Sequence, residues 1–138
     1  MPIDGLMARD YIDTMAAKLW RSIVSIYGDS AGNCPPIEYE LKASGIAGKA
    51  YYSGKIVFNI AYIMALDRPE LFDETIAHEL AHIVQYRLYP KAKQAHGVEF
   101  RDIMLWLGYS GNTYHDYNSS KAKNIAKANK GIDLLLSL

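Results

Sequence analysis

The stretch His78-Glu79-Leu80-Ala81-His82 lies in the middle of a segment with helical periodicity. Residues four apart on an α-helix share one face, with Cβ atoms about 5–6 Å apart, so two imidazoles at this spacing can reach one metal ion. The glutamate is rotated by roughly 100° from His78, which places its carboxylate beside such a metal and not on it. This HExxH order is typical of zinc metalloproteases, in which the glutamate acts as general base.

The helix that carries this stretch is predicted from its ends and its apolar face. We expect Asp67 to cap it, Pro69 and Glu70 to occupy its first turn, and Pro90 to end it. Its buried face would consist of Phe72, Ile76, Leu80, Ile83 and Val84. The alternative is a chance match on a solvated helix with two surface histidines. The apolar face and the presence of only four histidines in the chain favour a metal site.

A catalytic zinc site needs a third protein ligand and one open coordination position. We favour His96, because Gly97 lets the backbone fold closely around the site and a helix predicted from Val98 to Leu107 would orient the ligand. The other candidate is Glu99, with Asp102 supporting a histidine. The extended HExxHxxGxxH pattern is excluded, because position 85 is glutamine and position 88 is leucine.

The remaining segments alternate between helical and strand periodicity, with no internal repeat and no linker. The expected elements are a helix over 11–27 with a cap at Asp4, a strand over 37–41, strands over 49–52 and 55–59, a helical turn over 61–66, a basic helix over 120–130 and an apolar tail over 132–138. The two neighbouring strands would form a hairpin with a two-residue turn at Ser53-Gly54. Together these patterns predict one α+β domain.

Several motifs resemble the SprT-like metalloproteases, a family with bacterial SprT and eukaryotic Spartan members. The HExxH stretch is followed by His96-Gly97-Val98-Glu99-Phe100, which is similar to the family's downstream His-Gly-x-Glu-Phe/Trp. The other matching segments are Gly48 to Tyr52, Ile56 to Asn59, Glu74 to Ala77, Leu107-Gly108 and Tyr114 to Tyr117. The resemblance extends from Tyr11 to Asn118.

The resemblance implies a zincin-like minimal metalloprotease domain over residues 1–118, followed by a C-terminal extension over residues 119–138. Such a domain has a long N-terminal helix, a small antiparallel sheet, the HExxH helix and a following helix. The implied activity is zinc-dependent hydrolysis of peptide bonds, in proteins associated with or crosslinked to DNA. One alternative is a protease that cleaves a specific regulator without DNA. Another is a zinc-stabilised binding module without catalysis. The intact Glu79 argues against it, because a purely structural zinc site has no use for this glutamate.

Other residues are candidates for contact with a protein or peptide substrate. The strand over 55–59 could pair with an extended substrate through Ile56, Phe58 and Asn59. His115 is a candidate to stabilise the oxyanion of the reaction, or an ordinary loop histidine. The catalytic candidates are therefore Glu79 and His115, with His78, His82 and His96 as ligands of Zn²⁺.

Composition limits the partners. Lysine plus arginine and aspartate plus glutamate both total 15, so no global field indicates a nucleic acid or a membrane. A single-stranded DNA contact could come from Trp106 or from the C-terminal lysines, although core packing and a solvated helix face are the favoured interpretations. The single cysteine, Cys34, excludes an intramolecular disulfide and a cysteine-based zinc finger. Without a signal peptide or a run of about 20 apolar residues, we expect a soluble cytoplasmic protein, nucleoid-associated if its substrates are linked to DNA.

Overall fold

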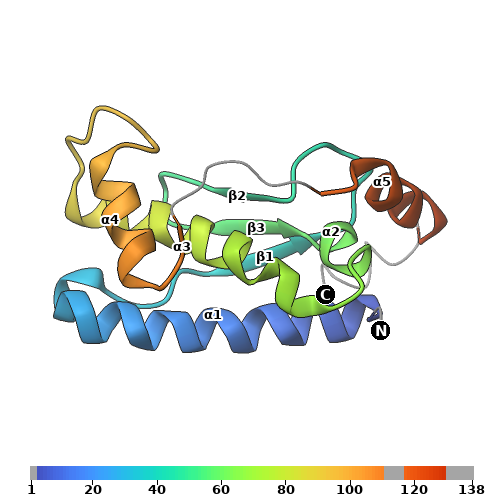
Figure 1. Cartoon of the computed structure of the whole chain (residues 1–138), viewed down its shortest axis with the longest axis horizontal. Helices are drawn as coiled ribbons and strands as arrows, with labels where there is room; N and C mark the ends of the chain where they lie inside the picture. Colours follow the sequence, from blue (N-terminus) through green and yellow to red (C-terminus); the bar gives the residue numbers. More distant parts are fainter. Residues whose placement is uncertain (1–2, 111–116, 130–138) are drawn as a thin grey trace.

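Helix α1 (Gly5–Tyr27) runs along most of the length of the molecule, with α4 near one end and α5 near the other (Figure 1). The computed structural model describes residues 3–110 and 117–129. The Asp4 carboxylate caps α1 by accepting the Met7 N–H at 2.8 Å, as predicted, so the helix begins earlier than its apolar periodicity suggests. Its inward face buries Ala8, Ile12, Ala16, Leu19, Trp20 and Ile23.

The three-stranded sheet has the order β1-β3-β2, with β1 at Ile37–Glu40, β2 at Gly48–Ala50 and β3 at Ile56–Asn59. The predicted α+β class is confirmed, but the sheet is mixed and not wholly antiparallel. Strand β2 is antiparallel to β3, whereas β1 is parallel to it. The loop over residues 41–47 causes this, because it carries the chain past the position that β3 then fills between the two earlier strands.

The hairpin between β2 and β3 has a three-residue turn, so the predicted two-residue turn is wrong. The Tyr51 N–H donates to the Lys55 carbonyl at 2.8 Å, and the Gly54 N–H donates to the Tyr51 carbonyl at 2.9 Å. These bonds leave Tyr52, Ser53 and Gly54 in the loop. Gly54 has a φ of +109°, a conformation that glycine adopts without a steric penalty. Ser-Gly therefore supplies only the last part of the turn.

The helix that carries the HExxH stretch, α3 (Asp73–Leu88), begins later than predicted. It follows α2 (Ile60–Met64) and a 3₁₀ turn, η2 (Pro69–Phe72), whose N-cap is Arg68 and not Asp67. The proline explains the difference, since it disfavours helical backbone in the residue before it, and Arg68 is extended with φ −139° and ψ 134°. Helix α3 packs against α1, β2 and α4 and is buried without a break from Thr75 to Gln85.

Two further helices cover the ends of the molecule. Helix α4 (Val98–Trp106) packs on α3, and α5 (Ser119–Ala128) packs on α2, where the Tyr62 hydroxyl donates to Ser119 Oγ at 3.1 Å. The division of the chain into residues 1–118 and 119–138 stays a prediction, and the predicted apolar tail lies outside the described residues. Within residues 3–110 and 117–129, no helix combines the length and the apolar character that crossing a bilayer requires.

Candidate metal centre

The imidazoles of His78, His82 and His96 converge on one point. The first two project from adjacent turns of α3 and are 6% and 7% exposed, while the third comes from the loop before α4. The Nε2 atom of His82 lies 3.1 Å from that of His78 and 3.0 Å from that of His96, and His78 and His96 are 3.3 Å apart. Three rings from two segments thus point their Nε2 atoms at a common centre.

The spacing of these nitrogens fits a transition-metal ion. Zinc–nitrogen bonds of about 2.0–2.1 Å at tetrahedral angles separate two ligand nitrogens by about 3.3 Å. Hydrogen bonding alone cannot satisfy the cluster, because a neutral Nε2 carries either one proton or one lone pair and cannot serve two neighbours. Among the described residues these three histidines are the group close enough to hold a metal. Within residues 3–110 and 117–129, no further histidine joins the three, which leaves a fourth tetrahedral position there.

Phe100 forms an apolar floor beneath all three rings. Its ring centroid lies 4.9 Å from that of His78, 4.7 Å from that of His82 and 4.9 Å from that of His96. The ring is fully buried and stacks on His82 at 27° between the planes. The apolar periodicity of α4 indicates only that Phe100 is buried, so its contact with the metal ligands was missed. The family pattern His-Gly-x-Glu-Phe/Trp was the available signal.

Burial keeps the imidazoles in the neutral form that binds metals. Desolvation lowers the pKa of His82 to about 4, and the neighbouring His96 adds to that shift. Desolvation also lowers the pKa of His96. Both shifts favour the lone pair over the proton at neutral pH, so these rings are available to a metal without first losing a proton.

Glu79 lies beside the histidines, buried to 6% exposure on the face of α3 that packs against β2. Burial raises the pKa of its carboxyl to about 7, and a hydrogen bond from the Ala50 backbone N–H partly opposes that rise. Gly48 allows this close packing, because a Cβ there would lie 3.2 Å from Glu79 Cγ and 3.0 Å from the Phe58 ring. A carboxyl with a pKa near neutrality can both accept and release a proton.

The edge of β2 that faces α3 is the open edge of the sheet. Tyr51 bonds β3 through the Lys55 carbonyl, and alternate residues of a strand turn their polar groups to opposite edges. Gly48 and Ala50 therefore direct theirs away from β3, which agrees with the bond from Ala50 to Glu79. Among the described residues β2 pairs with β3 alone. Backbone groups are thus available next to the histidine cluster.

The His96 loop is held by α3 itself. Gln85, 3% exposed, donates from Nε2 to the Gln94 carbonyl at 2.9 Å, two residues before His96. Gly97 is the N-cap of α4 and has a φ of −81°, so its role is to provide space and not an unusual backbone angle. A Cβ at this position would lie 3.3 Å from Gln94 Cβ and 3.4 Å from Glu99 Oε2. Gln85 was considered only as a departure from the extended metal motif, so its role in the loop was missed.

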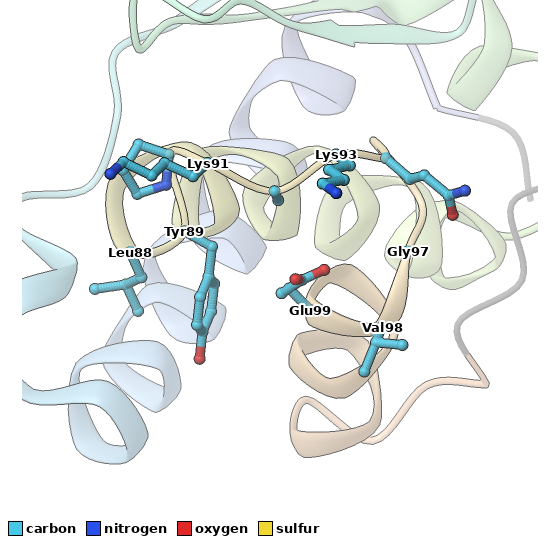
Figure 2. A pocket seen from close by; sticks show the side chains of 10 residues that line it. Leu88, Tyr89, Lys91, Lys93, Gly97, Val98 and Glu99 are labelled. Carbon is cyan, nitrogen blue, oxygen red and sulfur yellow. The ribbon is translucent and has the colours of Figure 1, made fainter.

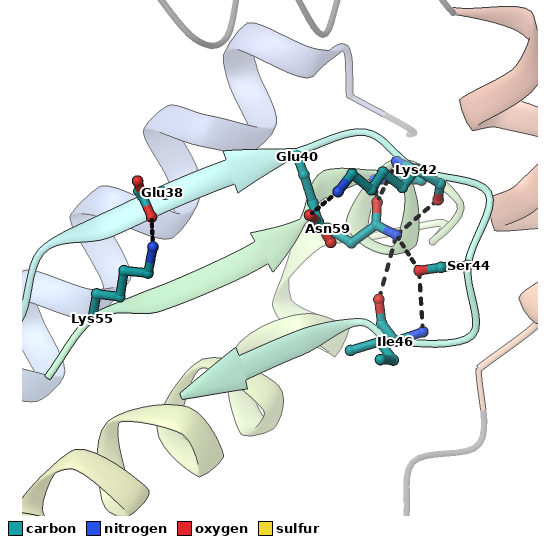
Figure 3. A network of polar contacts seen from close by, with 8 residues as sticks. Glu38, Glu40, Lys42, Ser44, Ile46, Lys55 and Asn59 are labelled. Carbon is teal, nitrogen blue, oxygen red and sulfur yellow. Dashed lines mark hydrogen bonds and ion pairs between the residues drawn. The ribbon is translucent and has the colours of Figure 1, made fainter. Parts of the chain in front are cut away.

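The predicted contact of β3 with substrate is wrong. Strand β3 is the central strand, paired on both edges, and Ile56 and Phe58 are fully buried. Asn59 is 1% exposed and its amide is used within the fold (Figure 3). Its Nδ2 donates to the Lys42 carbonyl at 2.8 Å, and its Oδ1 accepts the Ala61 N–H at 3.2 Å and so caps α2. No edge of β3 remains for an added strand.

Several other candidates lie away from the histidines. Glu99, the alternative third ligand, lines a hollow of about 630 Å³ between the end of α3 and the start of α4 (Figure 2). Asp102 is exposed, and Trp106 is 68% exposed, so the core packing expected for the tryptophan is wrong. Trp106 is the last residue of α4 and is not part of the buried face of that helix, which consists of Phe100, Ile103 and Met104. His115 lies outside the described residues, and its role stays a prediction.

Comparison with known proteins supports one family. The model of the SprT-like family matches residues 25–122, which include every residue of the histidine cluster. Protein SprT of Vibrio parahaemolyticus is 33% identical over 85 residues, covering 60% of this chain and 50% of that protein. Protein SprT of Actinobacillus succinogenes is 29% identical over 86 residues, covering 61% of this chain and 49% of that protein.

The relatives and the family model cover different shares of the chain. The chain spans about half the length of the curated relatives it matches. No solved structure matches it. The family model, by contrast, covers most of the chain, from the end of α1 to the first turn of α5. The chain belongs to the SprT-like family.

Proposed function

We propose that this protein is a zinc-dependent endopeptidase. The observation that carries the proposal is the convergence of three Nε2 atoms, 3.0–3.3 Å apart, beside the buried carboxylate of Glu79. Three histidines leave a fourth position for a reactant, which a purely structural zinc site does not need. A zinc-stabilised binding module would also have no use for a buried glutamate at this place, so we favour catalysis over that alternative.

His78, His82 and His96 would hold the ion. A zinc ion in such a site supplies Lewis-acid chemistry, since it polarises a peptide carbonyl and lowers the pKa of water towards about 7. The Glu79 carboxylate would take a proton from the attacking water and deliver it to the leaving amine. The Ala50 N–H would hold that carboxylate in place. Phe100 would exclude water from beneath the ligands.

The open edge of β2 is where we expect the substrate to lie. An extended peptide can add to an exposed strand through main-chain hydrogen bonds. Gly48 and Ala50 offer their carbonyl groups at this edge. The edge is close to the proposed general base, because Gly48 packs directly against the Glu79 side chain. Strand addition therefore moves from β3, where it was predicted, to β2.

The class of substrate is the finer part of the proposal. Helix α5 carries Lys121, Lys123 and Lys127 and no acidic residue. Lysines concentrated on one helix can neutralise phosphates. This supports DNA-associated proteins as substrates, with single-stranded DNA as a second partner, over a regulator cleaved without DNA. A cytoplasmic location near the nucleoid would follow and stays a prediction.

The test is cleavage of casein, a loosely folded protein, by the chelated and then zinc-reloaded chain. Glu79→Gln should lower kcat/KM by about 10²–10⁴-fold while zinc binding, measured by native mass spectrometry, is retained. Glu70→Gln is the matched control, because Glu70 is an exposed carboxylate that is not part of the histidine cluster. Cleavage that survives Glu79→Gln would remove the glutamate as general base. Stimulation of the wild-type rate by single-stranded DNA would support the DNA-linked substrates, and a rate unchanged by DNA would favour the regulator.

A further inference from the structure

A second, smaller cleft of about 220 Å³ lies between the β2–β3 hairpin and the His96 loop. Its walls are the rings of Tyr52, Tyr86 and Tyr89. The remaining lining residues are Gln85, Pro90, Ala92, Gln94 and Ala95. We call it the tyrosine cleft. No charged side chain lines it, although lysines line the larger hollow next to it.

The size of the tyrosine cleft suits one amino-acid side chain. Pockets that enclose a drug-sized ligand are usually about 300–1,000 Å³, so a cofactor would not fit here. At about 30 Å³ per water molecule, the volume corresponds to about seven waters. Aromatic rings and small apolar residues favour an apolar or aromatic occupant, and the lining holds no charged side chain that could pair with a lysine or a glutamate.

The position of the cleft connects it to the metal centre. Tyr86 follows His82 by one helical turn, and the two rings are stacked at 18° with centroids 6.1 Å apart. The Tyr52 ring contacts the Tyr86 ring at a centroid distance of 5.2 Å, with 53° between the planes. Ala95 directly precedes His96 in the chain. The cleft is therefore separated from the proposed metal ligand His82 only by the ring of Tyr86.

The cleft also lies where the open edge of β2 leads. Tyr52 follows the last residue of β2, Ala50, by two positions, so the chain places it at most about 7 Å from the end of the strand. A peptide paired along this edge, with its scissile bond beside Glu79, would carry a side chain past the cleft. That side chain would belong to a residue one or two positions from the bond.

We propose that the tyrosine cleft is a specificity subsite that receives an apolar or aromatic side chain of the substrate, one or two residues from the cleaved bond. This rests on the proposed peptidase activity. The large hollow of Figure 2 is a weaker candidate, because Lys91 and Lys93 line it together with Glu99 and the lining contains no residue of the histidine cluster. The residues that line the tyrosine cleft are sufficient by themselves to select an apolar side chain.

The first arm of the test maps cleavage of casein by mass spectrometry and then varies the preferred position as Phe, Leu, Ala, Lys or Glu in a ten-residue peptide. The Phe and Leu peptides should have kcat/KM values about tenfold or more above the Ala peptide, with Lys and Glu below it. Tyr52→Ala should remove most of this preference, and Tyr52→Phe should keep it. Tyr51→Ala is the matched control, because Tyr51 is on the same hairpin but does not line the cleft.

Filling the cleft gives the opposite kind of variant. Ala92→Phe should lower the ratio of kcat/KM for the Phe and Leu peptides to that for the Ala peptide by about tenfold. Ala17→Phe, on the exposed face of α1, controls for an added aromatic side chain. Unchanged ratios of Phe to Ala cleavage in both Tyr52→Ala and Ala92→Phe would overturn the subsite.

A binding arm separates the two proposals. The zinc-loaded Glu79→Gln variant is titrated with the same peptides, labelled with a fluorophore, and the dissociation constants are compared by fluorescence polarisation. If wild type cleaves no peptide but the Phe peptide still binds about tenfold more tightly than the Ala peptide, the peptidase function fails and the cleft stands as a side-chain site. If wild type cleaves in a Glu79-dependent way with no side-chain preference at any position, the cleft fails and the peptidase stands. If binding and cleavage both show no preference, the cleft proposal is overturned.

Discussion

Two of the three converging histidines lie on a buried helix, and the third lies on a loop. The spacing of His78 and His82 is set by one turn of α3, whose burial on several faces leaves the helix little freedom. The loop that carries His96 depends instead on a hydrogen bond from Gln85 and on packing against Phe100. A helix presets its ligands through local geometry, whereas the loop ligand needs tertiary contacts. The two regions should therefore respond differently to substitution.

Removing a ligand from either region should have the largest effect. His82→Ala and His96→Ala should each weaken zinc binding by more than about 100-fold, beyond what loss of an outer hydrogen-bond partner usually costs. The metal-free proteins should differ in stability, since His82→Ala leaves a buried cavity beside Phe100, while His96→Ala removes a half-buried ring and should cost less. Zinc competition titrations and urea unfolding measure the two quantities. Equal loss of metal-free stability in both variants would contradict the distinction between helix and loop.

Phe100 is the point where the two regions meet. Phe100→Ala should lower the free energy of unfolding by about 3–5 kcal/mol, because a fully buried ring is removed from beneath three imidazoles. Phe100→Leu should cost less and should still weaken zinc binding if the floor holds the ligands. Ile12→Val on α1 is a core control that should leave zinc affinity unchanged. Zinc affinity unaltered in Phe100→Leu would mean that Phe100 serves stability alone.

The pH dependence of stability sharpens the comparison within α3. The folded-state pKa of Glu79 is raised by burial from 4.5 to about 7, so folding opposes its ionisation, and the metal-free protein loses stability as pH rises from about 4.5 to 7. At pH 8 this cost is about 3 kcal/mol. Glu79→Gln should therefore be more stable than wild type at pH 8, by an amount that vanishes towards pH 4.5. A difference that is constant with pH would contradict this.

The pKa shift of His82 makes stability depend on pH in the opposite direction. Its folded-state pKa is lowered from 6.5 to about 4, so stability is complete above pH 6.5 and is lost as pH falls towards 4. In wild type the two groups largely offset one another between pH 4.5 and 6.5. In metal-free Glu79→Gln the loss on acidification should become visible in thermal melts. A melting temperature of Glu79→Gln that does not fall between pH 6.5 and 4 would contradict the lowered pKa of His82.

The loop should be loosened most selectively through Gln85. Gln85→Met keeps the volume but removes the donor to the Gln94 carbonyl, so zinc affinity should fall by about tenfold. Gln94→Ala is the matched control, because the acceptor is the backbone carbonyl and survives the substitution. Isothermal titration of zinc into both variants measures the effect. Equal losses in the two variants would show that the Gln94 side chain, and not the hydrogen bond, orders the loop.

Local periodicity was sufficient for the helices and for the pair of ligands on one of them. Helical spacing predicted most of α1 and the shared face of His78 and His82, and the residue type at position 4 predicted the cap, because these depend on contacts within four residues. The place of β3 could not be predicted in this way. Strand alternation indicates which residues are buried, but the order of strands depends on where the loop over residues 41–47 crosses, and that reversed the expected role of Ile56 and Phe58.

The motif and the family pattern were enough to identify His78, Glu79, His82 and His96 as one candidate site, since each follows from residue type and spacing along the chain. The contacts that bury and position these four residues depend on the tertiary structure. The Phe100 floor, the bond from Ala50 to Glu79, the Gln85 contact that holds the His96 loop and the tyrosine cleft all join segments that are distant in sequence. Such contacts exist only after α3, α4 and β2 have packed, because burial and the resulting pKa shifts are set by neighbours in space and not along the chain.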